Sequence, residues 1–364
     1  MRAGNRSHLF FVIVKPNPDK PHRGTLAAPK NRFEDREAVP DEDYDPSEDP
    51  LPRTEFLPDD SQTIIAYNDS PDLGFNASLN PYRGCEHGCV YCYARPTHEY
   101  LGFSQGLDFE TKIMVKHAAP ELLRRELAAK KWRPQTIAMS GVTDCYQPIE
   151  RRLKLTRRCL EVLAEVRNPV GIVTKNSLVT RDLDLLRELA AHDAVAVFIS
   201  LTTLDEKLRA VLEPRTSPPK ARLRTIEKLA AAGIPVGVMT APIIPALNDH
   251  EIPKLIAAAA AAGARQAAYV AVRLPYANRE LFERWLGEHF PDRKEKVLNQ
   301  IRALRDGKLN SSEFGGRMKG TGRLAGQIES LFHIACRKAG IGRDRLRLST
   351  SAFRRPPGDQ LEFF

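Results

Sequence analysis

The feature that most constrains the fold of this chain is a regular alternation of short apolar runs with helical patterns between residues 74 and 274. The apolar runs are rich in β-branched residues, as in "VGIVTK" (170–175) and "AVAVFISLTT" (194–203). Strands that are apolar on both faces belong to sheets covered by helices, and alternation with helices makes neighbouring strands parallel. The sequence therefore predicts an α/β protein with a parallel sheet.

Six parallel strands are expected, with helices between them. The strands are placed at 74–82, 136–141, 170–175, 194–201, 235–241 and 267–273, and a further strand at 109–116. The helices are placed at 119–131, 150–167, 180–192 (capped by Thr180), 218–232 (ended by Gly233) and 249–262. Right-handed crossovers would curl the six units into a partial (βα)6 TIM-like barrel. Chemistry in such barrels lies at the C-terminal strand ends.

Charge and composition divide the chain into three parts. Residues 1–60 are predicted to be a mostly disordered leader of which short pieces dock on the body, and 34–60 hold 12 acidic residues against 2 arginines, a net charge of −10. The barrel core is expected at 61–290 and a helical, basic extension at 291–364. The whole chain carries +9, so the body is basic. A basic body can attract nucleic acid, and scattered solubilising charge is the alternative.

The cellular setting follows from what the chain lacks. No apolar run approaches the roughly 20 residues that span a bilayer. The opening run "LFFVIV" is shorter than the about 7–15 apolar residues of a secretory signal and has no small-residue cleavage site. Three of the six cysteines lie within eight positions, which favours metal binding or catalysis over disulfides. We expect a cytoplasmic protein with no membrane partner.

The clustered cysteines are Cys85, Cys89 and Cys92 in "RGCEHGCVYCYARP" (83–96), on the loop after the first predicted strand. A structural zinc site takes four protein ligands, and the nearest fourth candidates are His87 and His98. A [4Fe–4S] cluster usually takes four thiolates, so three thiolates leave one iron open to a ligand. The spacing favours the open cluster; zinc, disulfides or inert thiols are the alternatives.

This motif resembles that of the radical S-adenosylmethionine (radical SAM) superfamily, which also has an aromatic residue before the last cysteine. The run "NPYRGCEHGCVYCYARPTHEYLG" is similar to the branch that contains spore photoproduct lyase and proteins labelled DNA repair photolyases. "GTLAAPKNRFE" and "EFGGRMKGTGRLAGQIESLF" resemble flanking segments of a poorly characterised bacterial subgroup of that branch. The resemblance covers roughly residues 20–340.

The resemblance implies a mechanism and its cofactors. The three cysteines would hold a [4Fe–4S] cluster whose free iron binds the amine and carboxylate of S-adenosylmethionine. One electron would cleave the sulfonium C–S bond, and the 5′-deoxyadenosyl radical would abstract hydrogen from an unidentified substrate. The implied electron donor is a small protein such as flavodoxin or ferredoxin.

Cofactor contacts can be placed on the loop and the second strand end. Tyr91 and Tyr93, on either side of the last cysteine, would supply stacking surface or shield the cluster. The second strand ends in "SGVTDCYQPIE", where the family has a Gly-Gly-Glu-like element for the methionine amine. That element is absent here, and Ser140, Thr143 and Asp144 are the polar candidates. Asp144 is alternatively the cap of the following helix.

Later strand ends supply further candidates. Lys175 would pair with the methionyl carboxylate, and Ser200 would meet the ribose hydroxyls; a solvated lysine and a satisfied strand-end hydroxyl are the alternatives. Glu213 and Arg215, in "LEPRTSPP" (212–219), would either touch substrate or pair with each other.

The substrate is less well defined than the chemistry. In spore photoproduct lyase a cysteine just after the second strand returns hydrogen to the substrate radical; Gly141 aligns with it, and Cys145 is either its replacement or a buried thiol. The segment "GGRMKGTGR" (315–323) suits phosphate contacts, but a flexible surface loop is equally consistent with it. A radical SAM enzyme of unknown substrate, the same chemistry on nucleic acid, and a non-catalytic metal-stabilised nucleic-acid-binding protein all remain open.

Overall fold

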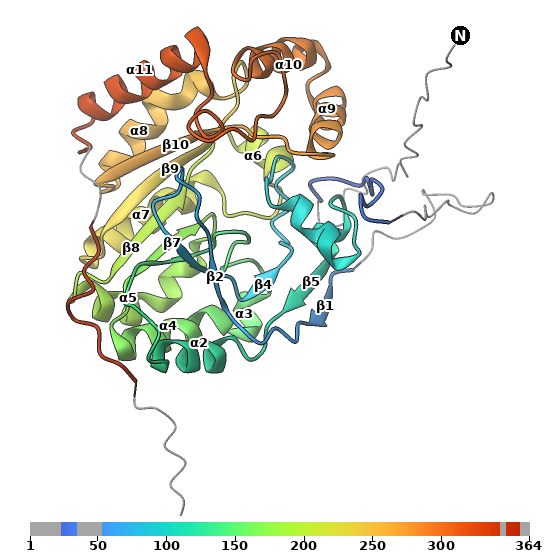
Figure 1. Ribbon diagram of the computed structural model, residues 1–364. Coiled ribbons are helices and arrows are strands. Elements are labelled where there is room, and N and C mark those ends of the chain that lie inside the picture. Colours follow the sequence, from blue (N-terminus) through green and yellow to red (C-terminus); the bar gives the residue numbers. More distant parts are fainter. Residues whose placement is uncertain (1–22, 35–52, 343–346, 357–364) are drawn as a thin grey trace, which may run out of the picture.

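A seven-stranded sheet, parallel except for one edge strand, forms the centre of the computed structural model, which describes residues 23–34, 53–342 and 347–356 (Figure 1). The strand order is β10-β9-β8-β7-β6-β3-β2. Its members are β2 (Ile65–Tyr67), β3 (Ala77–Leu79), β6 (Ile137–Met139), β7 (Val170–Thr174), β8 (Val195–Ser200), β9 (Val236–Ile243) and β10 (Gln266–Ala271). All pairs from β3 to β10 are parallel, whereas β2 pairs antiparallel with β3. The six predicted parallel strands and the partial-barrel fold are confirmed.

Helices cover the outer face of this sheet, as Figure 1 shows. They are α2 (Ala119–Ala128), α4 (Leu155–Val166), α5 (Leu183–Ala190), α7 (Pro219–Ala231) and α8 (Ile252–Ala261). Their leucine, valine and isoleucine side chains join those of the strands in one core. α7 ends before Gly233, whose φ of 74° is the left-handed conformation predicted there.

Several local predictions were wrong. The helix expected at 150–167 is split into α3 (Glu150–Leu153) and α4, because Lys154 between them has a φ of 53°. The third helix is preceded by a 3-10 turn, η2 (Ser177–Asp182), which Asn176 caps by accepting from the Leu178 amide. Thr180 caps nothing; its hydroxyl donates to the Ser177 carbonyl.

A second, small sheet carries the entrance to the cysteine loop. Its order is β1-β5-β4, with β1 (Glu55–Pro58), β5 (Lys112–Val115) and β4 (Tyr82–Arg83). The strand predicted at 74–82 is therefore divided between β3 and β4, with Pro81, which has no amide hydrogen, between the two. The strand predicted at 109–116 begins with a helical turn, α1 (Asp108–Thr111).

The C-terminal part contains α9 (Asn278–His289), α10 (Lys294–Ala303) and α11 (Gly322–Lys338). α11 lies beside α8 (Figure 1), and its Phe332 ring is 4.7 Å from the Tyr269 ring of β10. Ile328 and Phe332 share the core of the main sheet. α11 is thus packed as part of the barrel.

The segment between α10 and α11 connects the two edges of the open sheet. The Ala271 amide of edge strand β10 donates to the Met318 carbonyl at 2.8 Å. Arg317 pairs with Asp72, at the other edge, at 2.5 Å. Buried Arg305 donates to the Arg317 carbonyl of this segment and to the Ala271 carbonyl of β10. The segment 315–323 is therefore held to both edges of the sheet through Arg317 and Met318, which does not fit the alternative of a flexible surface loop.

Of the predicted leader, residues 1–22 and 35–52 lie outside the described residues, and 23–34 packs on the cysteine loop. The Gly24 and Thr25 amides donate to the Glu110 carboxylate at 2.9 and 3.2 Å. Gly24 lies so close to the loop that an added Cβ would be 1.6 Å from the Gly88 carbonyl oxygen. A glycine is required at this contact.

We predict that Gly24→Ala displaces residues 23–34 from the cysteine loop. A Cβ at 1.6 Å from backbone cannot be accommodated, and overpacking of this kind costs about 1–3 kcal/mol. Hydrogen exchange of peptides from this segment should become faster. Gly74→Ala is the matched control, because its Cβ would meet nothing within 4 Å. Equal protection in both variants would contradict the packing described here.

Candidate active site

The cysteine loop lies where the loops after β6, β7 and α6 (Glu206–Leu212) meet. The Val90 amide donates to the Leu212 carbonyl at 3.2 Å, and the Arg215 amide donates to the His87 carbonyl at 3.3 Å. His87 Nδ1 is 3.3 Å from the Asp144 carboxylate. The cysteine loop therefore lies at the C-terminal strand ends, as predicted.

The donor set of the loop consists of three thiols. Cys85, Cys89 and Cys92 are free, and the first two are buried. His87 is engaged on its two ring nitrogens by Asp144 and Asn176. His98 Nε2 is 2.9 Å from the Lys112 carbonyl, and its Nδ1 is buried without a hydrogen-bond partner. In the described part of the chain, no three His, Cys, Asp or Glu side chains are arranged to hold one metal ion. Three thiols without a fourth protein ligand fit a cluster with one open iron.

The electrostatics of the thiols depend on burial. Burial, then Asp144, raises the pKa of Cys85 well above its ordinary value. Burial raises the pKa of Cys89 to about 12 against the opposing effect of Lys175. A bound metal reverses this, because a coordinating thiol is deprotonated outright.

Asp144 connects the ends of β6 and β7. Its carboxylate accepts from the Thr174 hydroxyl at 2.7 Å and from the Lys175 amide at 2.8 Å. Burial opposes ionisation, but His87 and these two donors lower the pKa of Asp144 to about 2. Asp144 accepts from the Tyr146 amide in a local turn and does not cap a helix, so that alternative is wrong.

The other two candidates near Asp144 already make hydrogen bonds. Ser140 has a φ of 77°, and its hydroxyl oxygen accepts from the Cys145 amide at 3.0 Å. Thr143 is buried and its hydroxyl donates to the Tyr82 carbonyl at 3.0 Å.

Lys175 is a cation without a salt bridge among the described residues. Its ammonium lies 5.9 Å from the centre of the Tyr91 ring. Burial would lower the pKa of Lys175, but Cys89 and Glu213 raise it above its ordinary value. Lys175 therefore stays charged next to the cysteine loop.

Glu213 is fully buried and accepts from three side chains. Arg222 donates to it at 2.5 Å and the Thr202 hydroxyl at 2.6 Å, and the Tyr91 hydroxyl also donates to it. Burial opposes ionisation, but Arg222 and Lys175 lower the pKa of Glu213 to about 2. The same buried arginine donates to the carbonyl of Ser200, the buried last residue of β8.

The predicted Glu213–Arg215 pair is wrong. Arg215 instead pairs with Glu86 of the cysteine loop at 3.0 Å. Its other guanidinium nitrogen, Nη1, is buried without a partner.

Cys145 has no exposed surface and belongs to the main core. Its carbonyl accepts from Thr156, and burial raises the pKa of its thiol well above the ordinary value. The buried-thiol alternative therefore describes its position. Gly141, four residues earlier, accepts a hydrogen bond from the Tyr93 hydroxyl at 2.6 Å.

Sequence reasoning missed several residues that hold the loop. Arg95 is fully buried and donates to the Cys89 carbonyl at 3.1 Å, and Asn278 donates to the Cys92 carbonyl at 2.8 Å. Arg222 was also not singled out. Of these residues only Arg95 lies in the cysteine run itself, where a search for partners could have begun.

Comparisons with known proteins cover the part of the chain that carries this site. Residues 79–259 match the model of the radical SAM superfamily. An uncharacterized protein of Mycobacterium tuberculosis is 40% identical over 222 residues, 60% of this chain and 65% of that protein. An uncharacterized protein of Methanocaldococcus jannaschii is 31% identical over 173 residues, 48% of this chain and 62% of that protein. The matched part is thus less than two thirds of either relative.

Solved structures also share the fold. Spore photoproduct lyase complexed with dinucleoside spore photoproduct matches with a TM-score of 0.56 and 17% identity, covering 78% of this chain and 79% of that one. No helix in the described part of this chain is long and apolar enough to span a membrane.

We predict that Glu213→Gln lowers the free energy of unfolding by about 3–5 kcal/mol, because it leaves the buried Arg222 charge without its carboxylate. Urea denaturation under anaerobic, reducing conditions measures this change. Glu165→Gln is the control, since its pair with Arg124 is exposed and such pairs are worth about 1 kcal/mol or less. Similar losses in both variants would contradict a special role for the buried pair.

Proposed function

Because this chain belongs to the radical SAM superfamily, we propose that it is an enzyme that cleaves S-adenosylmethionine reductively at a [4Fe–4S] cluster to produce a 5′-deoxyadenosyl radical, which abstracts hydrogen from a substrate. The observation that carries this proposal is the set of three free thiols on one loop beside a charged lysine at the C-terminal strand ends.

In this proposal Cys85, Cys89 and Cys92 are the cluster ligands. Lys175 binds the methionyl carboxylate, because it is a half-buried cation without a salt bridge in the described part of the chain. Asp144 is ionised and offers negative charge to the methionyl amine. Ser140, Thr143 and Ser200 stay predicted cofactor contacts.

Other residues hold the loop and exclude water. Tyr91 is 7% exposed, and its hydroxyl is fixed by Glu213. Val90 beside it is fully buried against Leu212 and Leu208. A dry, fixed loop is needed because a carbon radical would react with water-exposed protein groups.

Anaerobic reconstitution with iron and sulfide, followed by S-adenosylmethionine and dithionite, tests the proposal. We predict 5′-deoxyadenosine from the wild-type protein and none from Cys89→Ala, which should stay folded but lose the cluster's visible absorbance. Cys159→Ala is the matched control, since Cys159 is a buried thiol of α4 in the main core. It should keep both absorbance and product.

Two results would reject the enzyme in favour of a non-catalytic metal-stabilised protein. One is a single bound zinc without inorganic sulfide. The other is unfolding of Cys89→Ala on metal loss, as expected where a metal site is structural.

A nucleic-acid substrate is the second candidate, and the end of β10 favours it. Arg273 lies within electrostatic range of both Arg305 and Arg317. Of these three arginines, within the described ranges, only Arg317 forms a salt bridge with Asp72. The Arg273 guanidinium is 5.8 Å from the Tyr93 ring centre, and Arg317 is 4.5 Å from the exposed Phe314 ring. Cations beside exposed aromatic rings suit phosphates and stacked bases.

We predict that a single-stranded oligonucleotide binds with an affinity that falls steeply with salt, and that Arg273→Met reduces the slope of log K against log salt by about 0.7. Fluorescence anisotropy across a salt series measures both. Arg224→Met, an exposed arginine of α7, should leave the slope unchanged. Binding without salt dependence, or none at all, would remove nucleic acid as the substrate class.

A further inference from the structure

The loops that lead into the parallel strands lie at the opposite end of the barrel from the cysteine loop. Three consecutive ones are residues 129–136 before β6, 167–169 before β7 and 191–194 before β8. The segment 347–356, which we call the basal strap, runs past the ends of α5, α4 and α2 beside them (Figure 1). We call the seven cations of these loops and of the strap the basal surface: Lys130, Lys131, Arg133, Arg167, Arg347, Arg354 and Arg355.

Hydrogen bonds to the backbone fix the basal strap on these loops. The Ser349 amide donates to the Asp193 carbonyl at 2.9 Å. Arg354 and Arg355 donate to carbonyl groups in the last turns of α4 and α2. Cations are favourable at these positions because the last carbonyls of a helix lack partners within the helix. The strap therefore holds its own arginines next to the cations of the loops.

The charge of the basal surface is not neutralised by acidic side chains of the chain. The three loops and the strap contain seven Lys or Arg residues and one acidic residue, Asp193. Glu165, whose carbonyl accepts from Arg354, has its carboxylate paired with Arg124. In the part of the chain that the structure describes, none of the seven cations forms a salt bridge. Residues 343–346 and 357–364 lie outside that part, and their sequence adds two arginines and three acidic residues, so the region keeps a positive charge.

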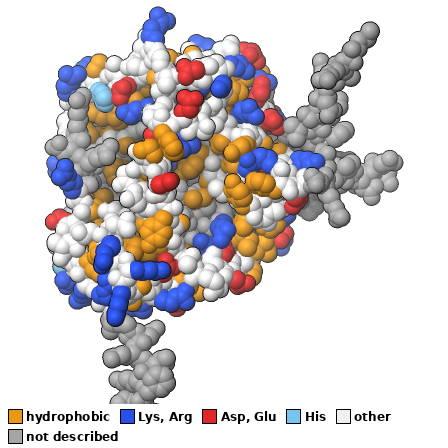
Figure 2. All heavy atoms as spheres, in the orientation of Figure 1, with side chains coloured by type: hydrophobic (Ala, Val, Ile, Leu, Met, Phe, Trp, Pro, Cys, Tyr) orange, Lys and Arg blue, Asp and Glu red, His pale blue; other side chains and the backbone are white. Residues whose placement is uncertain are grey.

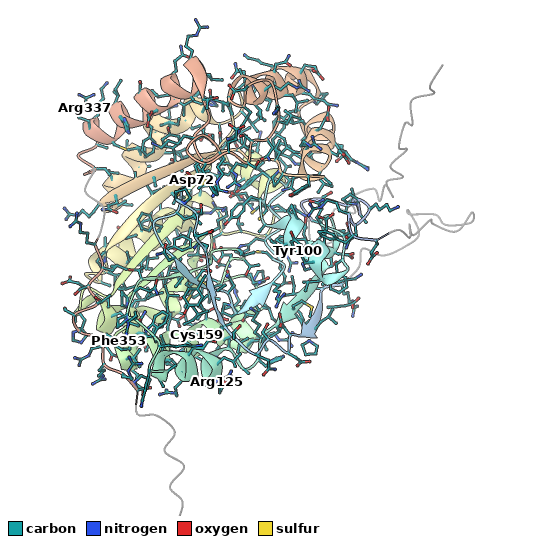
Figure 3. The ribbon with its side chains drawn as sticks, viewed as in Figure 1. Asp72, Tyr100, Arg125, Cys159, Arg337 and Phe353 are labelled. Carbon is teal, nitrogen blue, oxygen red and sulfur yellow. The ribbon has the colours of Figure 1, made fainter. Side chains whose placement is uncertain are left out.

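The basal surface offers no large exposed apolar side chain among the residues described. Trp132 is 3% exposed, and Phe353, labelled in Figure 3, is half-buried. Figure 2 shows Lys and Arg side chains gathered at the lower left of the view, where the described chain ends. Helices that lie on membranes insert apolar side chains, single-stranded nucleic acid stacks its bases on aromatic rings, and protein interfaces centre on aromatic anchors. A surface with cations and without such groups favours a duplex that is contacted through its phosphates.

We propose that the basal surface binds double-stranded nucleic acid through the phosphate backbone, without reading the bases. Contacts from Lys and Arg to phosphates position a protein on a duplex and carry no sequence information. The surface lies at the end of the barrel away from the cysteine loop, so this binding is separate from the substrate contacts proposed at the end of β10. It holds the protein on a duplex whatever reaction takes place at the cysteine loop.

The variant that combines Lys130→Met, Lys131→Met and Arg133→Met tests this proposal. The three side chains are exposed and make no hydrogen bond among the described residues, so their loss should leave the basal strap in place. Binding of a fluorescein-labelled DNA duplex is followed by anisotropy across a salt series, with reconstituted full-length protein and without S-adenosylmethionine. Each phosphate contact contributes about 0.9 to the slope of log K against log salt, so the slope should fall by about 2.7.

A matched control removes two lysines and one arginine from the other end of the barrel. Lys207→Met, Lys254→Met and Arg293→Met change exposed residues around a hollow beside α6 and α8. This variant should keep the wild-type slope, and so should Arg273→Met. Lys131→Met alone should lower the slope by about 0.9, which tests the proposal with a single substitution if the triple variant does not fold.

The outcomes separate this inference from the proposed chemistry. Wild-type protein that does not bind the duplex overturns it, and so do a wild-type slope in the basal variants or equal losses in the control. Binding to phosphatidylcholine vesicles that contain phosphatidylserine, at a salt concentration at which the duplex is not bound, assigns the surface to a membrane and also overturns it. Absence of 5′-deoxyadenosine rejects the proposed function and leaves this result unchanged, because the binding is measured without that reaction.

Discussion

The buried ion pair between Glu213 and Arg222 is the interaction on which the geometry of this site depends. Two charges out of water are stable only when their remaining hydrogen-bonding capacity is satisfied. Glu213 meets this condition by accepting from Tyr91 and Thr202, and Arg222 by donating to the carbonyls of Ser200 and Ser217. The pair therefore joins the cysteine loop to the end of β8 and to the segment that contacts Lys175.

Around the cysteine loop, the anionic and the cationic side chains differ in whether they have partners within the chain. The carboxylates of Asp144, Glu213 and Glu86 all accept from donors of the chain. Lys175, by contrast, has no salt bridge within the described ranges, and one nitrogen of Arg215 is buried without a partner. Cys89 and Glu213 keep Lys175 charged without forming a salt bridge with it, which leaves room for an anionic partner such as the carboxylate that we propose it binds.

The strands of the sheet could be predicted from the sequence, because the apolar pattern that identifies a strand lies within the strand itself. An apolar run such as 194–201 can be buried only in a covered parallel sheet, and the strand is found there as β8 (Val195–Ser200). Side-chain partners are decided by packing between distant segments. Glu213 and Arg215 are neighbours in sequence, yet one pairs with Arg222 inside the barrel and the other with Glu86 of the cysteine loop. Composition and spacing carry no information on such a choice.

The open sheet poses a separate problem, since exposed edge strands offer unpaired backbone groups to other chains. Here the segment before α11 supplies the missing partner at β10 through the Met318 carbonyl, and Arg305 fixes that segment to the barrel. Arg317 of the same segment reaches Asp72 beside the opposite edge. The residues that satisfy the edge therefore also bring arginines to the end of β10 next to Arg273 and Tyr93. One local structure, the segment before α11, therefore both covers the edge of the sheet and places cations at the end of β10.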